Sequence, residues 1–131
     1  MRIPKHIQDV ISKQDLHTLA TATPDGVPNI IYVKFLKVHD DERVLIANNK
    51  FQKTEENLST NPQLAFVVLD EENHCSYQLK GTVSIHNDDE IFKETARWVE
   101  DEAPRPDIRA KAGVLLHVEE IYKGAEKIEE E

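Results

Sequence analysis

The sequence contains little of what several common protein classes require. Among its 131 residues there is one cysteine, Cys75, which excludes an internal disulfide and a zinc site built from several thiolates. Its four glycines form neither a phosphate-binding loop nor a dinucleotide-binding fingerprint. No apolar run approaches the roughly 20 residues of a membrane-spanning helix, and residues 1–15 place charges among their apolar positions, unlike a secretory signal. We therefore expect a soluble cytoplasmic protein.

Positive charge is also scarce. The chain has 16 Lys plus Arg against 25 Asp plus Glu, which gives a formal net charge of −9 at pH 7. Proteins that bind nucleic acids or anionic membranes neutralise phosphates with basic side chains, so this balance excludes both as general partners. A hydrophobic content of 39% supports one core, and the length fits a single domain over residues 1–131.

The first half of the chain alternates short apolar segments with turns. Residues 3–11 carry apolar side chains at i, i+4, i+7 and i+8, the spacing of one helix face. Residues 16–23 are typical of a strand, and the Pro-Asp-Gly turn at 24–26 leads into a long second strand over 27–38. A polar hairpin loop then precedes a third strand over 44–47. Joined by short loops, these strands predict an antiparallel meander.

The second half adds two helices and three strands. Residues 53–58 have helix composition, and residues 64–69 are six consecutive apolar residues, which predicts a strand buried on both faces. Strands are expected over 75–85, with Gly81 as a bulge or close-approach point, and over 113–118. Between them a helix starts at the acidic residues 88–90, and the tail at 124–131 is expected to be flexible. Six strands with three marginal helices predict a mainly β fold, a small closed or split antiparallel barrel.

One stretch of the chain is locally basic. From residue 34 to residue 53 there are three acids, all in the hairpin loop, and five basic residues: Lys34, Lys37, Arg43, Lys50 and Lys53. Lys53 and Thr54 fall where a loop enters the predicted helix, and the unpaired backbone N–H groups of a helix start favour an anion. Lys53 would supply a charge and Thr54 a hydroxyl donor to one phosphate. The alternative is that Thr54 only caps the helix.

This helix belongs to a longer pattern. Residues 53–62 run Lys-Thr-Glu-Glu-Asn-Leu-Ser-Thr-Asn-Pro, after an N-terminal helix, a strand with a Pro-Asp-Gly turn, Pro28, a long second strand and the segment 44–49. Downstream, residues 77–81 form a strand segment that ends in glycine. Over residues 5–122 this arrangement resembles the FMN-binding split-barrel family, that of pyridoxamine 5′-phosphate oxidase and its small FMN-binding or flavin-reductase-like relatives. The resemblance implies a six-stranded antiparallel split β-barrel and a homodimer with the flavin at the subunit interface.

The resemblance also implies a set of FMN-binding residues, which are Ile30, Ile31, Tyr32, Val33, Ile46, Ala47, Asn48, Asn49, Gln52, Lys53, Thr54 and Arg109. The first four would line one side of the isoalloxazine ring, the next four would offer backbone groups to its polar edge, and residues 52–54 would bind the phosphate. Arg109 would reach the flavin of the partner subunit, either stacked over the ring or paired with the phosphate. A flat ring needs an apolar wall, whereas a phosphate needs fixed donors and positive charge.

Two departures from the family pattern argue against oxidation of pyridoxamine phosphate itself. Those oxidases place an arginine–lysine pair at the phosphate, where this chain has Gln52 and Lys53. The chain also has no counterpart of their long C-terminal segment. We therefore expect an FMN-dependent oxidoreductase or flavin reductase, in which hydride or electrons from a small-molecule or protein donor pass through flavin N5. No side chain is assigned a catalytic role.

Two other classes of function stay open. A split barrel of this kind could bind deazaflavin or haem, and haem would need an axial ligand, for which His17, His86 and His117 are the plausible donors. The six histidines show no i, i+3 or i, i+4 pairing on a helix, so no metal site is predicted. The other class is a cofactor-free interaction module that keeps the barrel.

Two single residues also allow more than one interpretation. Trp98 lies off the centre of its helix's apolar stripe, so we expect it at the buried edge of that stripe or in a subunit contact. Cys75 follows His74 beside a predicted turn and is either one half of a reactive pair or an ordinary buried cysteine.

Overall fold

The computed structural model describes residues 1–130. Over these residues the elements follow in the order α1 (Lys5–Lys13), β1 (His17–Ala22), β2 (Pro28–Val33), β3 (Leu36–Val38), β4 (Arg43–Asn48), α2 (Lys53–Thr60), β5 (Gln63–Asp70), β6 (Cys75–His86), α3 (Glu90–Glu102), β7 (Ala112–Lys123) and β8 (Glu126–Ile128). No helix in this part of the chain is both long and apolar enough to cross a bilayer. The fold is mainly β with three helices, as the sequence predicts.

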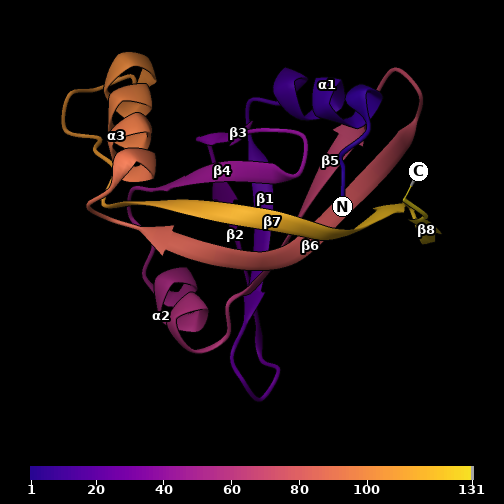
Figure 1. Ribbon diagram of the computed structural model, residues 1–131, viewed down its shortest axis with the longest axis horizontal. Helices are drawn as coiled ribbons and strands as arrows, with labels where there is room; N and C mark the ends of the chain where they lie inside the picture. Colours follow the sequence, from indigo (N-terminus) through magenta and orange to yellow (C-terminus); the bar gives the residue numbers. More distant parts are fainter. Residues whose placement is uncertain (131) are drawn as a thin grey trace.

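All the strands belong to one antiparallel sheet. Their order is β2-β1-β5-β6-β7-β4-β3, and β8 is added beside β7. β2 and β3 stand at opposite ends of this order, yet only Lys34 and Phe35 separate them in the chain. The two ends of the sheet therefore lie close together, which curls it into a half-barrel (Figure 1).

The sheet has eight strands where the sequence predicts six. The strand expected over 27–38 breaks at its middle, because Val33 is the last residue paired with β1 and Leu36 is the first paired with β4. The backbone exchanges one partner strand for another at this corner. In the tail expected to be flexible, residues 126–128 pair with β7 as β8, while Glu131 lies outside the described residues.

The inner side of the half-barrel holds the main core. α1 buries Ile7, Val10 and Ile11, which confirms the predicted apolar face of this helix. These residues belong to one hydrophobic cluster with Phe66 of β5 and Leu79 of β6. Because successive residues of a strand face opposite sides, each strand gives this core only every second side chain.

β6 and β7 form the longest ladder of the sheet. Their register shifts between Lys80 and Gly81. A Cβ at position 81 would overlap the backbone carbonyl of His117 on β7, so only glycine fits here. The prediction that Gly81 marks a bulge with close backbone approach is confirmed.

One end of the sheet is covered on its outer side by α3. This helix packs on β4 and β7 (Figure 1) and buries Thr95 and Val99. It begins directly after Asp89, whose carboxylate accepts a hydrogen bond of 3.1 Å from the backbone N–H of Phe92. The acidic helix start expected at 88–90 is therefore confirmed, with Asp89 as the N-cap.

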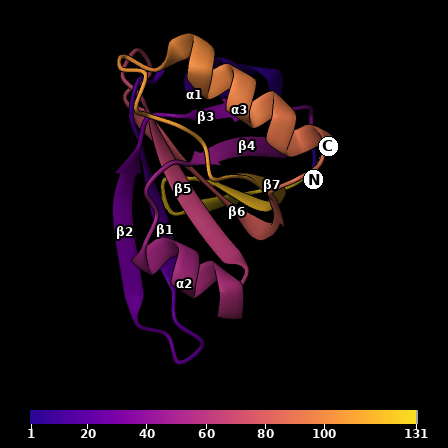
Figure 2. The ribbon, with the colours of Figure 1, turned by 90° about the vertical axis from the view of Figure 1, so that its left-hand side faces the viewer.

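The other end of the sheet has no such cover. β2 runs along the margin of the molecule in Figure 2, and the outer residues of β5, Val67 and Leu69, are 43% and 50% exposed. The prediction that residues 64–69 are buried on both faces is wrong for the single chain, because buried and accessible positions alternate along β5. The apolar residues of β5 therefore pack against a core on only one face of the strand.

Candidate functional site

A cavity lies where the two ends of the sheet approach each other. Its volume is about 380 Å³, within the range of roughly 300 to 1,000 Å³ that is typical of small-molecule sites. Three segments supply its walls: β2 with the corner that follows, the connection from β4 to α2, and the loop between α3 and β7. The lining residues are Ile31, Tyr32, Val33, Lys34, Phe35, Ala47, Asn49, Lys50, Phe51, Pro104, Arg105 and Ile108. The structure thus brings together Ile31, Tyr32, Val33, Ala47 and Asn49 from the set predicted to bind FMN.

The four predicted residues of β2 do not form one wall. Ile31 and Val33 turn inward and pack against the main core. Ile30 and Tyr32 turn outward and are 68% and 74% exposed; Tyr32 also lines the cavity, whereas Ile30 does not. Because β2 ends the described sheet, one row of its backbone N–H and C=O groups has no partner strand. Those groups can offer hydrogen bonds to a polar ligand edge.

The predicted residues of β4 and its loop divide into structural and accessible ones. Ile46 belongs to the main core, and Ala47 packs in a second cluster with Phe35 and Val99. Asn48 is buried, and its side-chain oxygen accepts a hydrogen bond of 3.0 Å from the backbone N–H of Phe51. This bond fixes the loop that leads from β4 to α2, so the Asn48 side chain shapes the cavity wall without lining it.

The start of α2 follows closely in the chain after the cavity residues Lys50 and Phe51. The helix begins at Lys53, and Gln52 at the N-cap makes no side-chain capping bond, so the first backbone N–H groups have no capping side chain. Lys53 is exposed, with its Nζ 3.3 Å from Glu56 Oε1. Thr54 is 1% exposed, and its hydroxyl accepts a bond of 3.2 Å from the side-chain amide of Asn29 on β2.

The position of Thr54 excludes one of its two interpretations, that of a helix cap. Thr54 does not cap α2, because it lies one residue inside the helix rather than before it. It is also buried between α2 and β2 instead of lying at the exposed helix start, so the structure shows it joining the two elements. The exposed residues at this end of α2 are Gln52, Lys53, Glu55 and Glu56.

The arginine predicted to reach the cofactor lies apart from the cavity. Arg109 is exposed and lines a different hollow of about 500 Å³ beside α3. Its backbone carbonyl accepts a bond of 3.0 Å from the side-chain amide of Asn49, which joins the two loops. Arg105 lines both hollows, and its Nε is 3.3 Å from Asp107. Within one chain, Arg105 is therefore the arginine at the cavity.

Seven residues that line the cavity are absent from the predicted set: Lys34, Phe35, Lys50, Phe51, Pro104, Arg105 and Ile108. Phe51 carried a usable signal, because it is the one apolar residue in the polar segment 48–53. Lys34 and Lys50 belong to the locally basic stretch 34–53, whereas Arg105 lies near the predicted Arg109 but is an isolated basic residue in a loop, which is common at any protein surface.

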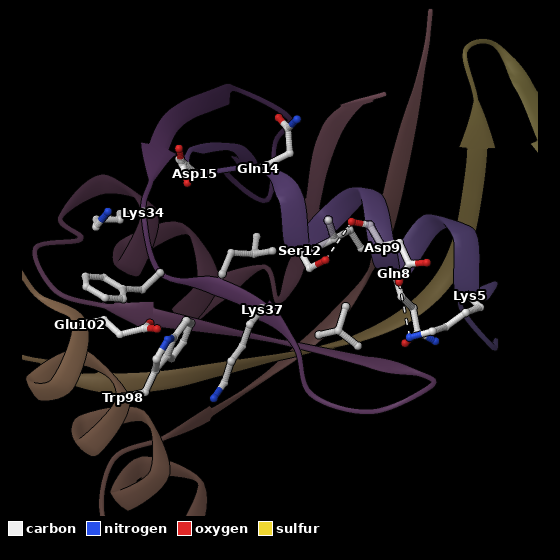
Figure 3. Close-up of a pocket in the computed structure, with 14 residues that line it drawn as sticks. Lys5, Gln8, Asp9, Ser12, Gln14, Asp15, Lys34, Lys37, Trp98 and Glu102 are labelled. Carbon is white, nitrogen blue, oxygen red and sulfur yellow. Dashed lines mark hydrogen bonds and ion pairs between the residues drawn. The ribbon is translucent and has the colours of Figure 1, made fainter. Parts of the chain in front are cut away.

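A second and larger hollow, of about 780 Å³, lies between α1, the β2–β3 corner and α3 (Figure 3). Lys34 and Phe35 line both this hollow and the 380 Å³ cavity, so the corner forms the wall between them. Trp98 is half-buried here; its ring meets Phe35 edge-on at 5.5 Å, and Lys37 Nζ lies 4.5 Å from its centroid. Trp98 thus lies at the edge of the buried face of α3, which is the first of its two expected positions.

The three histidines considered as haem ligands lie on three different strands and line neither hollow. His17 is 2% exposed inside the core; His86 contacts Ser84 and Asp89 through its two ring nitrogens; His117 is exposed on β7. Across residues 1–130, no three His, Cys, Asp or Glu side chains gather in a way that could hold a metal ion.

The chain is similar to several known proteins. An uncharacterized protein of Methanocaldococcus jannaschii is 38% identical over 109 residues, which cover 79% of this chain and 69% of that protein. Among solved structures, HupZ of Group A Streptococcus is similar with a TM-score of 0.84 at 23% identity, covering 98% of this chain and 99% of that one. An FMN-binding protein of Syntrophomonas wolfei gives a TM-score of 0.75 at 18% identity, over 87% and 80% of the two chains.

Other solved structures of the same fold are named for different cofactors. An F420 reductase has a TM-score of 0.71 at 19% identity, over 91% of this chain and 98% of that one. The haem storage protein HutZ of Vibrio cholerae has a TM-score of 0.69 at 19% identity, over 95% and 96%. At such identities these likenesses show the fold alone. The sequence model of the family described as pyridoxamine 5′-phosphate oxidase matches residues 3–123, so the chain belongs to the pyridoxamine 5′-phosphate oxidase family.

Proposed function

We propose that the chain binds FMN in the 380 Å³ cavity and acts as an FMN-dependent oxidoreductase or flavin reductase. The observation that carries the proposal is that the cavity residue Phe51 lies two residues before Lys53, the start of α2, in the chain. An apolar hollow beside a free strand edge suits a flavin ring, while an uncapped helix start with a lysine suits its phosphate.

Lys53 is available for this role despite its contact with Glu56. Both side chains are largely exposed, at 48% and 71%, and exposed ion pairs of this kind contribute little free energy. A phosphate that also receives backbone N–H groups would therefore compete well for the ammonium group. Gln52 would stand where oxidases of the family have a basic residue, and one positive charge fewer favours weaker cofactor binding.

The chemistry would come from the cofactor, because flavin N5 accepts and donates hydride or electrons. The chain would position the ring between the inward residues Ile31 and Val33 and the loop residue Phe51, and would keep water from that side. Asn48 would hold the loop in place through its bond to Phe51. No nucleophile or general base is required of this cavity for electron transfer.

We also propose that the chain forms a homodimer through the uncovered outer face of β2, β1 and β5. On this face the register aligns Tyr32, Thr18 and Val67 in one row across the three strands. Tyr32 belongs both to this face and to the cavity lining, so a second copy seated here would lie against the cofactor. Residues of the α3–β7 loop such as Arg109 are the candidates to reach across to it.

Deazaflavin is the second candidate cofactor, because its ring and phosphate make the same demands on the site and an F420 reductase shares the fold. Haem fits this cavity less well. A haem storage protein has this fold, but none of the candidate axial histidines lines the cavity.

The first test is a visible absorption spectrum of the purified chain, before and after incubation with excess FMN and desalting. We expect a flavin band near one equivalent per chain, which a nicotinamide cofactor bleaches in the absence of oxygen. A band typical of deazaflavin, or a Soret band, would replace FMN in the proposal. Absence of any saturable binding would leave the cofactor-free interaction module.

Two matched lysine variants sharpen this test. Lys53→Ala removes the proposed phosphate contact, and we expect FMN affinity to fall about tenfold or more, the value of one charge-assisted hydrogen bond. Lys93→Ala is the control, because Lys93 is also an exposed lysine in an i,i+3 pair, 3.2 Å from Glu90 on α3. Equal affinity of the two variants would contradict the phosphate assignment.

A further inference from the structure

Three side chains at the junction of β6 and α3 form a continuous hydrogen-bonded chain. Ser84 Oγ lies 2.7 Å from His86 Nε2, and His86 Nδ1 lies 2.7 Å from Asp89 Oδ2. Ser84 and His86 are partly buried, and Asp89 is exposed. None of the three lines the cavity proposed for FMN, so the group is separate from that site.

The chemistry of the three groups fixes the direction of these hydrogen bonds. A carboxylate can only accept, so His86 Nδ1 carries the proton and donates it to Asp89. In the neutral ring Nε2 is then the acceptor, and the Ser84 hydroxyl donates to it. The hydrogen bond from His86 also helps to hold the pKa of the Asp89 carboxyl below its ordinary value, so this group is ionised near neutral pH.

A capping role explains only part of this arrangement. Asp89 Oδ1 accepts the N–H of Phe92 and thereby caps α3. That function needs neither the contact of Oδ2 with His86 nor the contact of His86 with Ser84. A serine on Nε2 and a carboxylate on Nδ1 of one imidazole is instead the arrangement in which a histidine takes a proton from a nucleophilic hydroxyl.

We propose that Ser84 is the nucleophile of a second site, with His86 as its base and Asp89 as the residue that orients the base, acting on small acyl esters. Ser84 Oγ would attack the ester carbonyl carbon while its proton passes to His86 Nε2. The alkoxy group would leave with that proton as an alcohol, and the acyl group would remain on Ser84. Water would then attack the acyl-serine, lose its proton to His86, and release the acid while Ser84 regains its proton.

In this proposal, the start of α3 would supply the hydrogen-bond donors that stabilise the oxyanion. The helix begins at Glu90, one residue after Asp89. Of its first backbone N–H groups, that of Phe92 is already bonded to Asp89, so those of Glu90 and Ile91 would be the donors to the oxyanion that forms on the ester. Ser84 and His86 are only partly buried, so a small acyl donor can reach them.

The test is covalent labelling of the purified chain with a fluorophosphonate, together with hydrolysis of p-nitrophenyl acetate. We expect one phosphonyl group per chain on Ser84, located by peptide mass spectrometry, and release of p-nitrophenol. Ser84→Ala should abolish both signals. Asp89→Asn keeps a side chain able to cap α3 but weakens the base, and we expect labelling to slow about 100-fold, within the range of general-base contributions.

Ser59→Ala is the matched control, because the Ser59 hydroxyl donates to the backbone carbonyl of Glu56 and has no histidine beside it. Its labelling should equal that of the parent chain. The proposal is overturned if the parent is not labelled under conditions that label a known serine hydrolase, if Ser84→Ala is labelled as fast as the parent, or if Asp89→Asn leaves the rate unchanged. These readouts do not involve flavin, so they are independent of the proposed FMN site.

Discussion

The two ends of the sheet differ in how their outer faces are covered. On β4 and β7, α3 seals the face, and Leu45, Ala47 and Leu115 are fully buried there. On β2, β1 and β5, outward residues of the same apolar kind lie open, with Ile30 and Tyr32 among the most exposed large side chains. The outer face of the sheet is thus covered by α3 at one end and uncovered at the other.

Small residues explain how the covered end is sealed. Gly113 on β7 and Ala47 on β4 are paired in register and leave room for α3, whose Thr95 hydroxyl would lie only 2.5 Å from a Cβ at position 113. The uncovered end carries larger residues such as Tyr32 and Val67 on its outer face, where they are 74% and 43% exposed, and no helix within residues 1–130 covers them. The chain thus covers the outer sheet face at β4 and β7 with its own helix, and we propose that a second copy of the chain covers the outer face at β2, β1 and β5.

The largest expected effect comes from charging the bare face. Val67→Lys places an ammonium group at the centre of the proposed dimer contact, away from the cavity lining. We expect the dimer dissociation constant to rise about 30-fold or more, equivalent to about 2 kcal/mol, as at a central interface residue. Sedimentation equilibrium over a concentration series measures it.

The control for this change is Lys93→Glu, which alters an exposed charge on the helix that covers the other end. It should leave the association unchanged. A parent chain that is monomeric at all concentrations, or a Val67→Lys variant that associates as well as the parent, would contradict the proposed dimer.

A smaller effect is expected from crowding the covered end. Gly113→Ala introduces the Cβ that meets Thr95, so α3 must shift, and we expect the free energy of unfolding to fall by about 1 to 3 kcal/mol. Urea unfolding followed by circular dichroism measures it. Thr95→Ala removes the hydroxyl that Cβ would meet, so the double variant should recover most of the loss. If the two losses simply add, the contact between Gly113 and Thr95 is not what limits the approach of α3.

The smallest effect concerns a buried histidine in the core that both ends share. Burial lowers the pKa of His17 from its ordinary value of 6.5, and its Nδ1 has no hydrogen-bond partner among the described residues. As the pH falls through 6.5 the unfolded chain therefore takes up this proton before the folded chain does, and the free energy of unfolding decreases.

His17→Gln cannot titrate, so its urea midpoint should fall less than that of the parent between pH 7.5 and pH 5.5. Carboxyl groups with lowered pKa values, such as Asp89 hydrogen-bonded by His86 and Glu120 by Tyr122, act at lower pH and do not disturb this window. Parallel pH dependence of the two chains would show that His17 is not the group responsible.

Local patterns predicted much of the fold. The apolar face of α1, the acidic start of α3 and the bulge at Gly81 follow from spacing, charge and the one residue type that lets two backbones approach closely. The exchange of partners at Lys34 did not, because the residues on both sides of it have the same strand character. The strand breaks because its first half pairs with β1 and its second half with β4. No local sequence pattern encodes this choice of partner strand.

The candidate site was predictable in part for the same reason. Its apolar strand residues and the lysine at the helix start carry the signal of their own segments, whereas Arg105 joins the cavity only because the α3–β7 loop folds back against β2. The hydrogen bonds that join Ser84, His86 and Asp89 were also missed, since this combination of spacings, two residues and then three, matches no known triad motif. Side chains that meet across a strand end and a helix start are visible only once both are placed.

The sequence by itself determined the mainly antiparallel β architecture, the three helices, the family and the loop–helix junction at Lys53, because each depends on residues that are neighbours in the chain. The tertiary structure alone decided which faces are covered, which predicted residues line a common cavity and which, like Ile46 and Thr54, lie buried in the packing of the protein. Burial is a property of what lies opposite a residue, and for a curled sheet the opposite residues come from distant parts of the chain.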